Sequence, residues 1–379
     1  MFESIDAIDI YNKNINILIG SGASADLFPT LGLAITNEND ETETIETLAT
    51  QFAHVPSKHA ALFMHYYNTC IHPVQNYDPM LLVREQETKN QENYESFIKT
   101  LVGLLDKKKG LSRKINIFTT NYDGCLSFAA DSVLMNDTHN FVVNDGASGF
   151  HTKHLHIKNF NSFQCQTSAL ERHNYGIPQL NIINLHGSVY WSKSRDKIQV
   201  NYNSSANNFL PAAIRENLYD YSSYLATKGN KTKDIPEVPL SQDEISNFWE
   251  SYNQLPIVNP TKWKFHETLF EEHYYQMLRL LSYELEKPNS ILITFGFSFA
   301  DEHILKLIQR SLTNPYLQAF VCCYSDSGVL RISEEFRGWS NVSIIGPPKG
   351  EVLNFTNFNK YVFSLRPERY VAPDEDEAT

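Results

Sequence analysis

Short apolar runs, each ending in glycine or small polar residues, predict the strands of this 379-residue chain. The strongest runs are six or seven residues long and rich in Ile, Leu and Phe, which is typical of strands buried on both faces. They lie at 14–19, 114–120, 180–185 and 290–295. Two weaker runs predict further strands over 317–324 and 341–345.

Apolar residues at helical spacing lie between these runs. Residues 41–72 carry Ile45, Leu48 and Phe52 on one face, and residues 92–109 repeat the pattern. Asp301 is a typical N-cap for a helix after the run 290–295. Buried strands that alternate with amphipathic helices predict an α/β fold, with a Rossmann-like parallel sheet flanked by helices.

Two polar stretches interrupt this alternation, at 135–179 and 201–262. The first is rich in Asn, His and Thr, and the second in Asn, Ser, Tyr and Pro. We interpret both as helical or irregular insertions that form a smaller lobe on the sheet. The organisation we expect is one domain over 1–365, with its core strands within 14–345, and a solvated acidic tail over 366–379.

Charge and cysteine content exclude several classes of protein. The chain has 32 Lys and Arg against 44 Asp and Glu, a formal net charge of −12, which argues against direct strong binding of nucleic acid. The basic residues at 107–109 and 113–114 are expected at a solvated helix end. The five cysteines form no C-x-x-C pair, which argues against a disulfide framework and a zinc ribbon. No apolar run approaches the ~20 residues of a membrane span, so we expect a cytoplasmic protein without membrane association.

The turns after the four strong strands carry the candidate chemistry. Ligands of an open parallel sheet bind beyond the carboxyl ends of its strands, so we expect these turns to converge on one crevice. In the first turn, Gly20-Ser21-Gly22-Ala23-Ser24, the glycines allow close approach of a pyrophosphate at a helix N-terminus. A loop that only packs a helix explains these glycines equally well. No Gly-Lys-Ser/Thr follows, which argues against kinase or ATPase chemistry.

Single polar residues in the later turns each have two interpretations. Asn121 either caps a turn or holds a water or a sugar hydroxyl with its amide. Asp123 either caps the next helix or accepts a hydrogen bond from a ribose or an amide. His186, followed by Gly187, is either structural or a general base near neutral pH, and its place beside the other turns favours the base.

Other reactive residue types fit structural roles better. His151, His154 and His156 have a spacing that suits a metal, but their polar surroundings without cysteine favour a surface loop or hairpin. Cys322 and Cys323 are adjacent in a predicted strand, so their side chains should enter the core on opposite faces. We expect no metal.

Four motifs occur in an order that resembles the sirtuin (silent-information-regulator) superfamily. They are GSGAS at 20–24 with Phe28-Pro29-Thr30 after it, TTNYD at 119–123, NLHGS at 184–188 and GFSFAD at 296–301. Residues 142–146, VVNDG, are similar to a segment of prokaryotic members. The resemblance spans about 15–310 and is thin between the motifs.

The resemblance implies NAD in a Rossmann-like cleft, with Asn121 and His186 as catalytic residues and His186 as the general base. Asn121 and Asp123 would surround the nicotinamide and its ribose. The cofactor-binding residues implied are Gly20, Ser21, Gly22 and Ala23 at the phosphates, Gly296 and Ser298 at the adenosine half, and Thr120, Tyr122, Asp123 and Asp301.

The chain lacks the two C-x-x-C pairs of the zinc module in deacylating sirtuins. It therefore resembles the zinc-free prokaryotic relatives, which are NAD-cleaving effectors of antiphage defence. Some of these pair with a HerA-type ATPase, some with an Argonaute-type protein, and some carry a fused nucleotide-sensing domain. The size of the chain favours a separate effector subunit whose activity is gated by a partner protein. We expect that partner to be a HerA-type ATPase in preference to an Argonaute-type protein. By analogy with these relatives, we also expect the chain to form a homo-oligomer.

The function expected from these arguments is hydrolysis of the nicotinamide–ribose bond of NAD. Two alternatives stay open. An NAD-dependent protein deacylase would release nicotinamide only with an acetylated peptide. A non-catalytic subunit that senses NAD or ADP-ribose would bind the nucleotide and release no nicotinamide.

Overall fold

The computed structural model describes residues 4–81, 84–136, 139–167, 174–203, 207–260 and 268–367, and its centre is a seven-stranded sheet. Every pairing in this sheet is parallel. The strands follow one another in the order β15 (Val342–Ile345), β14 (Gln318–Cys322), β13 (Ser290–Phe295), β1 (Asn14–Ile19), β4 (Lys114–Thr119), β10 (Gln179–Asn184) and β5 (Val142–Asn144). The predicted α/β class and Rossmann-like parallel sheet are confirmed.

The chain fills the sheet outward from β1 in two directions. It first builds β4, β5 and β10 on one side, and then β13, β14 and β15 on the other. The direction of winding therefore reverses between β1 and β13. Such a reversal opens a crevice beyond the carboxyl ends of the two strands, where ligands of open α/β sheets bind.

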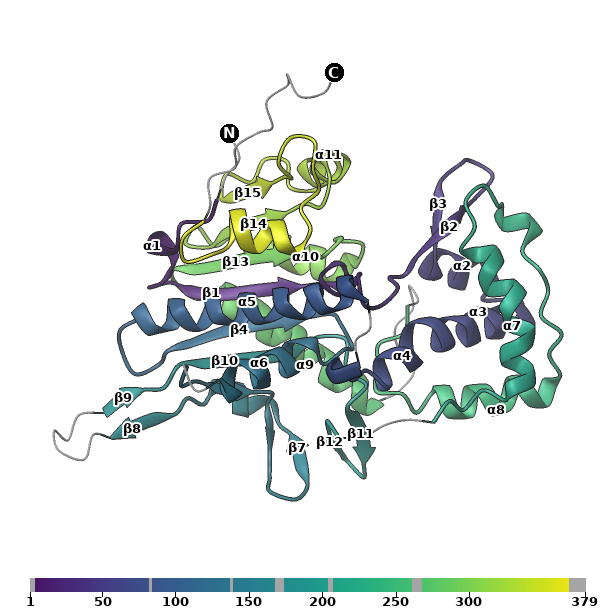
Figure 1. Ribbon diagram of the computed structural model, residues 1–379, viewed down its shortest axis with the longest axis horizontal. Helices are drawn as coiled ribbons and strands as arrows, with labels where there is room; N and C mark the ends of the chain where they lie inside the picture. The colour runs from purple at the N-terminus through teal and green to yellow at the C-terminus, as the bar shows by residue number, and fades with distance from the viewer. Residues whose placement is uncertain are drawn as a thin grey trace.

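Helices cover both faces of the sheet and give three layers (Figure 1). Along β1, Ile17 and Ile19 face one hydrophobic core and Leu18 faces the other, because successive strand residues point to opposite faces. The first core is covered by α1 (Ala7–Ile10), α5 (Glu85–Lys107), α6 (Cys125–Met135), α12 (Phe355–Asn357) and the π-turn η6 (Phe358–Val362). The second core is covered by α9 (Thr268–Leu285), α10 (Glu302–Ser311) and α11 (Asp326–Glu335).

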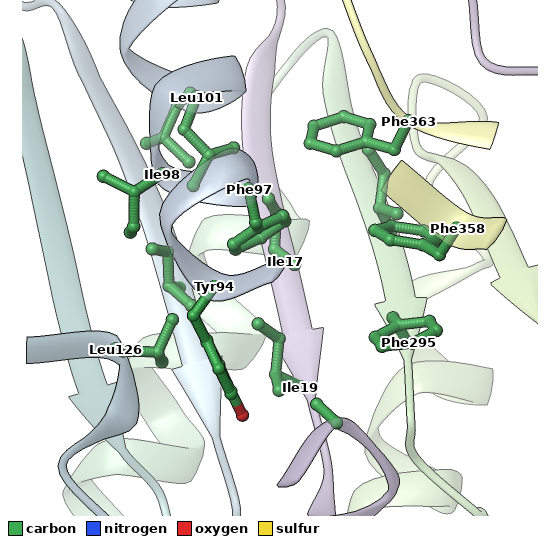
Figure 2. Packing of buried hydrophobic residues seen from close by; sticks show 14 of the residues in the cluster. Ile17, Ile19, Tyr94, Phe97, Ile98, Leu101, Leu126, Phe295, Phe358 and Phe363 are labelled. Atoms are coloured by element: carbon green, nitrogen blue, oxygen red, sulfur yellow. The ribbon is translucent and has the colours of Figure 1, made fainter. Parts of the chain in front are cut away.

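The first core is held by aromatic residues between α5 and the sheet (Figure 2). Tyr94 and Phe97 of α5 are 0% and 1% exposed, and they pack over β1 with Phe295 and Phe358. The rings of Phe295 and Phe358 are stacked, with their centroids 4.3 Å apart. This packing fixes α5 above the carboxyl end of β1.

A helical lobe with its own core lies beside the sheet (Figure 1). Residues from 31–75 and from 207–257 build it together, and α3 contacts both α7 and α8. Its elements are the β2 (Gly32–Thr36) and β3 (Thr42–Thr44) hairpin, α2 (Ile45–Phe52), α3 (Pro56–Tyr66), the π-turn η2 (Tyr67–Ile71), α4 (His72–Gln75), α7 (Ala212–Leu225), the 3₁₀ turn η5 (Thr232–Asp234) and α8 (Gln242–Tyr252). The smaller lobe thus draws on the helices of 41–72 as well as on the polar stretch 201–262.

The expectation that the polar stretch 135–179 is a helical or irregular part of the smaller lobe is wrong, because its described residues are divided among three sheets. It supplies β5, the edge strand of the central sheet, beside β10. It also supplies β6 (Ala147–Ser148) and β7 (Lys153–Leu155), which join β11 (Trp191–Ser194) and β12 (Lys197–Val200) in an antiparallel sheet. The last part forms the hairpin of β8 (Cys165–Thr167) and β9 (Asn174–Gly176), which projects from the molecule (Figure 1). The remaining short turns are η1 (Ser21–Ser24), η3 (Pro79–Leu81) and η4 (Ile157–Asn161).

Several local predictions are confirmed. All seven central strands lie within 14–345. Cys322 and Cys323 are both 5% exposed and enter the two different cores. Lys107 and Lys109 are exposed at the end of α5 as expected, whereas Lys108 and Arg113 are half-buried and bind the main-chain carbonyls of Lys13 and Leu105. Residues 368–379 of the predicted acidic tail lie outside the described residues.

A row of buried amides crosses the sheet from strand to strand. Asn16, Asn116 and Asn181 are direct neighbours in register on β1, β4 and β10. The Asn116 amide donates to Asn16 Oδ1 at 2.9 Å and accepts a hydrogen bond from Asn181 Nδ2 at 2.8 Å. Asn144 of β5 donates to Asn181 Oδ1 at 3.0 Å. Because these amides match only in one alignment, a slipped strand would leave buried polar groups without partners.

We expect Asn116→Leu to lower the free energy of unfolding by about 1–3 kcal/mol, because it leaves Asn16 Oδ1 buried without its donor. Urea denaturation followed by circular dichroism measures the change. Asn39→Ala, at an exposed position, is the matched control and should change stability by less than about 0.5 kcal/mol. Equal stability of the two variants would contradict a role for the amide row.

Candidate functional site

A pocket lies at the carboxyl ends of β1, β4, β10 and β13, where the four motif turns meet as expected. The space between its walls, including the part that is open to solvent, amounts to about 940 Å³. Residues of the helical lobe and of the segment 258–260 complete the wall. The pocket therefore lies between the sheet and the helical lobe.

Most of the predicted site residues line this pocket. They are Ser21, Thr120, Asn121, Tyr122, Asp123, His186, Gly296, Ser298 and Asp301. Gly20, Gly22 and Ala23 are not among the lining residues. Their backbone packs against Gly296 instead.

The glycine turn after β1 is fastened to the turn after β13. Gly20 N–H donates to Phe295 O at 3.1 Å, and Gly22 N–H donates to Gly296 O at 2.9 Å. A Cβ on Gly20 would lie 2.5 Å from Gly296 O, and one on Gly22 would lie 2.9 Å from Gly296 Cα. The glycines are thus required for close approach of two backbones, which is the packing interpretation of this turn.

The prediction that a helix begins at the glycine turn is wrong. Ser21–Ser24 forms a single 3₁₀ turn, in which Ala23 N–H donates to Gly20 O at 3.1 Å. Because the N–H groups of Gly20, Gly22 and Ala23 all have main-chain partners, they offer a phosphate less than the sequence suggested. No pattern of residue types distinguishes this short turn from the first turn of a longer helix.

Ser24, which sequence reasoning left out of the site, connects the other polar side chains. Its hydroxyl donates to Asp123 Oδ2 at 2.8 Å and accepts from Asn121 Nδ2 at 3.2 Å. Its single proton is used by Asp123, so the Tyr94 hydroxyl, 2.7 Å away, donates to Ser24. Asn90, one turn before Tyr94 on α5, donates to Ala23 O at 2.9 Å. Helix α5 therefore holds the glycine turn by two buried side chains.

The carbonyl oxygen of the Asn121 side chain has no hydrogen-bond partner among the described residues, although the residue is only 7% exposed. Its Nδ2 is fixed by Ser24, and its backbone N–H donates to Thr119 Oγ1 at 3.0 Å. Buried acceptors normally have a donor. An acceptor aligned by its own network on the wall of a pocket is suited to a ligand hydroxyl or a water.

Asp123 takes the capping role that was one of its two interpretations from the sequence. Its Oδ1 accepts from the N–H of Cys125, the first residue of α6, at 3.1 Å, and its Oδ2 lines the pocket network with Ser24. Loss of bulk water raises the pKa of the Asp123 carboxyl, and hydrogen bonds from Ser24 and Cys125 oppose that rise.

His186 faces an acidic partner that follows β13, three strands away from β10 in the sheet. Its Nε2 is 3.0 Å from Asp301 Oδ2, and the two side chains are 13% and 7% exposed. Asp301 also caps α10 as predicted, because its Oδ1 accepts from the N–H groups of His303 and Ile304. The Tyr274 ring of α9 lies 5.9 Å from the imidazole, centroid to centroid.

The loop after β10 is bonded to residues that follow α8 of the helical lobe. His186 O accepts from Val258 N–H at 2.8 Å, and Gly187 pairs with Ile257 in a single bridge. Gly187 has φ +86°, and a Cβ there would lie 2.0 Å from Pro256 O. Tyr122 OH donates to Val258 O at 2.8 Å. The turns that carry Asn121 and His186 therefore share one strap, Pro256–Ile257–Val258.

The helical lobe supplies an apolar wall that the sequence did not assign to the site. It includes Tyr66 of α3, Cys70 of η2 and Val74 of α4, and Glu46 adds a carboxyl group. Burial raises the pKa of the Cys70 thiol to about 12, so this cysteine stays protonated at neutral pH and is a poor nucleophile. Only the three-dimensional packing brings residues 46–74 over the sheet.

The histidine cluster follows its predicted surface role. His154 lies on β7 of the β6–β7 hairpin, and His156 caps η4 by accepting from Lys158 N–H. Among the residues that the structure describes, no group of three or more His, Cys, Asp or Glu side chains is arranged to hold a metal ion. Within the same residues, no helix has both the length and the apolar character of a membrane span.

The chain matches no known protein-family model, and no curated protein matches it in sequence.

We expect Gly296→Ala to destabilise the protein more than Gly338→Ala, although both glycines have positive φ. The cost of that backbone conformation is about 1–2 kcal/mol in either case. At Gly296 the new Cβ also lies 2.5 Å from Ala23 N, whereas nothing lies within 4 Å at Gly338. The clash should add about 1–3 kcal/mol. Denaturant unfolding of both variants measures the difference, and equal losses would contradict a tight contact between the two turns.

Proposed function

We propose that the protein is an NAD⁺ glycohydrolase, which cleaves the nicotinamide–ribose bond to give nicotinamide and ADP-ribose. The observation that carries the proposal is the unpartnered Oδ1 of Asn121 in a pocket that also contains the His186 imidazole. The motif resemblance to sirtuins supplies the substrate class.

The arrangement of polar groups supports a defined placement of the substrate. The nicotinamide and its ribose would lie at Asn121 and Asp123, where the Ser24 network aligns both side chains. The adenosine half would lie toward Gly296 and Ser298, with the diphosphate passing Ser21. This order follows the reversal of winding between β1 and β13, where dinucleotides cross an α/β sheet.

The charges of the pocket suit a cationic transition state. Glu46, Asp123 and Asp301 line it, and the described lining residues include no Lys or Arg. As the C1′–N bond breaks, its electron pair goes to the nicotinamide, which leaves neutral, and positive charge moves to the ribose. Acidic groups aimed at developing positive charge lower such a barrier.

Water completes the reaction in this proposal. Asn121 Oδ1 would accept a hydrogen bond from the ribose or from the attacking water. The water oxygen bonds to C1′ while His186 takes a proton from the water or from a ribose hydroxyl. The strap over His186 and the apolar wall from the helical lobe would limit competing solvent around the ribose.

The biological setting is proposed on the resemblance alone. We propose a cytoplasmic effector of a bacterial antiphage defence system that acts by depleting NAD. A partner protein, a HerA-type ATPase ahead of an Argonaute-type protein, would gate the activity, and the effector would assemble as a homo-oligomer. An NAD hydrolase without a gate would harm its host, which is the reason to expect a partner.

We expect His186→Ala and Asn121→Ala each to lower nicotinamide release about 10²–10⁴-fold, the contribution of one positioned base or its equivalent. Chromatography of NAD incubated with the protein measures the products. His151→Ala, at an exposed histidine of the β6–β7 hairpin, is the matched control and should retain full activity. Unchanged rates in both site variants would refute the site, and release that needs an acetylated peptide would favour deacylation.

We expect low turnover by the isolated chain and a higher rate with its gating partner. The same chromatographic assay, run with and without a co-expressed HerA-type ATPase, measures the activation. Equal rates in the two samples would contradict gating. Calorimetric binding of NAD with no nicotinamide release in either sample would favour a sensing subunit.

A further inference from the structure

The contact between His186 and Asp301 joins two lining residues of the pocket. β10 and β13, which carry the two residues at their carboxyl ends, are separated in the sheet by β4 and β1. The 3.0 Å distance between Nε2 and Oδ2 therefore joins the two halves of the sheet above the predicted ribose position. Sequence analysis placed Asp301 among the cofactor-binding residues, and the geometry gives it another role.

Asp301 is fixed in one orientation before it meets His186. Its Oδ1 accepts two N–H groups at the start of α10, from His303 at 2.9 Å and Ile304 at 3.2 Å. The preceding turn is rigid, because Gly296 and Phe299 have φ of +65° and +59°, and Phe299 is only 5% exposed. The cap thus occupies one carboxylate oxygen and directs the other to the imidazole.

We propose that Asp301 is a positioning residue for His186, and this inference rests on the proposed hydrolase function. The negative charge of the carboxylate, 3.0 Å from Nε2, favours a proton on that nitrogen, although the pair does not have the alignment of a hydrogen bond. Nδ1 is then the acceptor nitrogen of the neutral ring. When His186 takes a proton from water, Nδ1 binds it, the water oxygen bonds to C1′, and the carboxylate stabilises the imidazolium. Asp301 itself keeps its charge throughout, as the aspartate of a Ser-His-Asp triad does.

Other groups of the pocket do not replace this contact. Tyr274 and Tyr122 lie close enough to Asp301 for its charge to contribute to the rise of their pKa values, so both are neutral phenols there. Asp123 is engaged by Ser24 and Cys125. Asp301 is thus the carboxylate that lies 3.0 Å from the imidazole.

Asp301→Asn separates the positioning role from the capping role. Asparagine caps a helix about as well as aspartate, so α10 and the melting temperature should be preserved. Because the cap needs the side-chain oxygen, the amide NH₂ must face Nε2, and its positive end disfavours a proton on that nitrogen. We expect the neutral ring to change from the Nε2–H to the Nδ1–H tautomer, and kcat to fall about 10²–10⁴-fold.

The tautomer is measured by ¹⁵N NMR of histidine-labelled full-length protein, with His186→Gln to assign the resonance. Asp6→Asn is the matched control, because Asp6 caps α1 through Ile8 N–H at 2.8 Å, and it should change neither kcat nor the spectrum of His186. Nicotinamide release with the gating partner gives kcat.

Each outcome decides between the two proposals. A wild-type ring that is mainly Nδ1–H overturns the positioning role, and this result does not depend on how well the variant folds. An unchanged tautomer in Asp301→Asn overturns the positioning role as well. An unchanged kcat in Asp301→Asn also overturns it. If the tautomer changes as expected while wild-type protein releases no nicotinamide with any partner, the contact stands and the hydrolase function fails.

Discussion

The close backbone contact between the turns after β1 and β13 fixes the starting points of two polar groups of the site, the Ser24 network and Asp301. Gly20 and Gly22 approach Gly296 so closely that none of the three positions has room for a Cβ. On one side of this contact the chain continues to Ser24, whose hydroxyl organises Asn121 and Asp123. On the other side it continues to Asp301. The Ser24 network and Asp301 are thus both attached to the same close backbone contact.

The motif positions are the part of this architecture that the sequence could predict. Apolar runs that end in glycine or small polar residues imply buried parallel strands, and parallel strands bring their carboxyl ends to one edge. That reasoning was sufficient to place Asn121 and His186 in one pocket. It worked because both the strand and the turn after it are local features, which a few consecutive residues determine.

Features that depend on packing between distant segments could not be predicted in the same way. Tyr94 has the spacing of a core residue on α5, and its core burial is confirmed, but its hydroxyl also holds Ser24. Glu46 and Cys70 reach the pocket only because the helices of 45–75 pack with α7 and α8 into the lobe beside the sheet. The pairing of His186 with Asp301 needs the strand order, since 115 residues of chain separate them (301 − 186).

The construction of the pocket also bears on how a partner would control it. Its floor is formed by turns of a sheet whose register is fixed by buried amides, and such a floor resists deformation. Its wall comes from the helical lobe, which reaches the catalytic turns through Val258, bonded to both His186 O and Tyr122 OH. A force on the helical lobe is therefore transmitted through Val258 to the His186 backbone by one hydrogen bond and to the Tyr122 side chain by another. Under the proposed function, the lobe is the element through which gating would act, because the sheet has no comparable freedom.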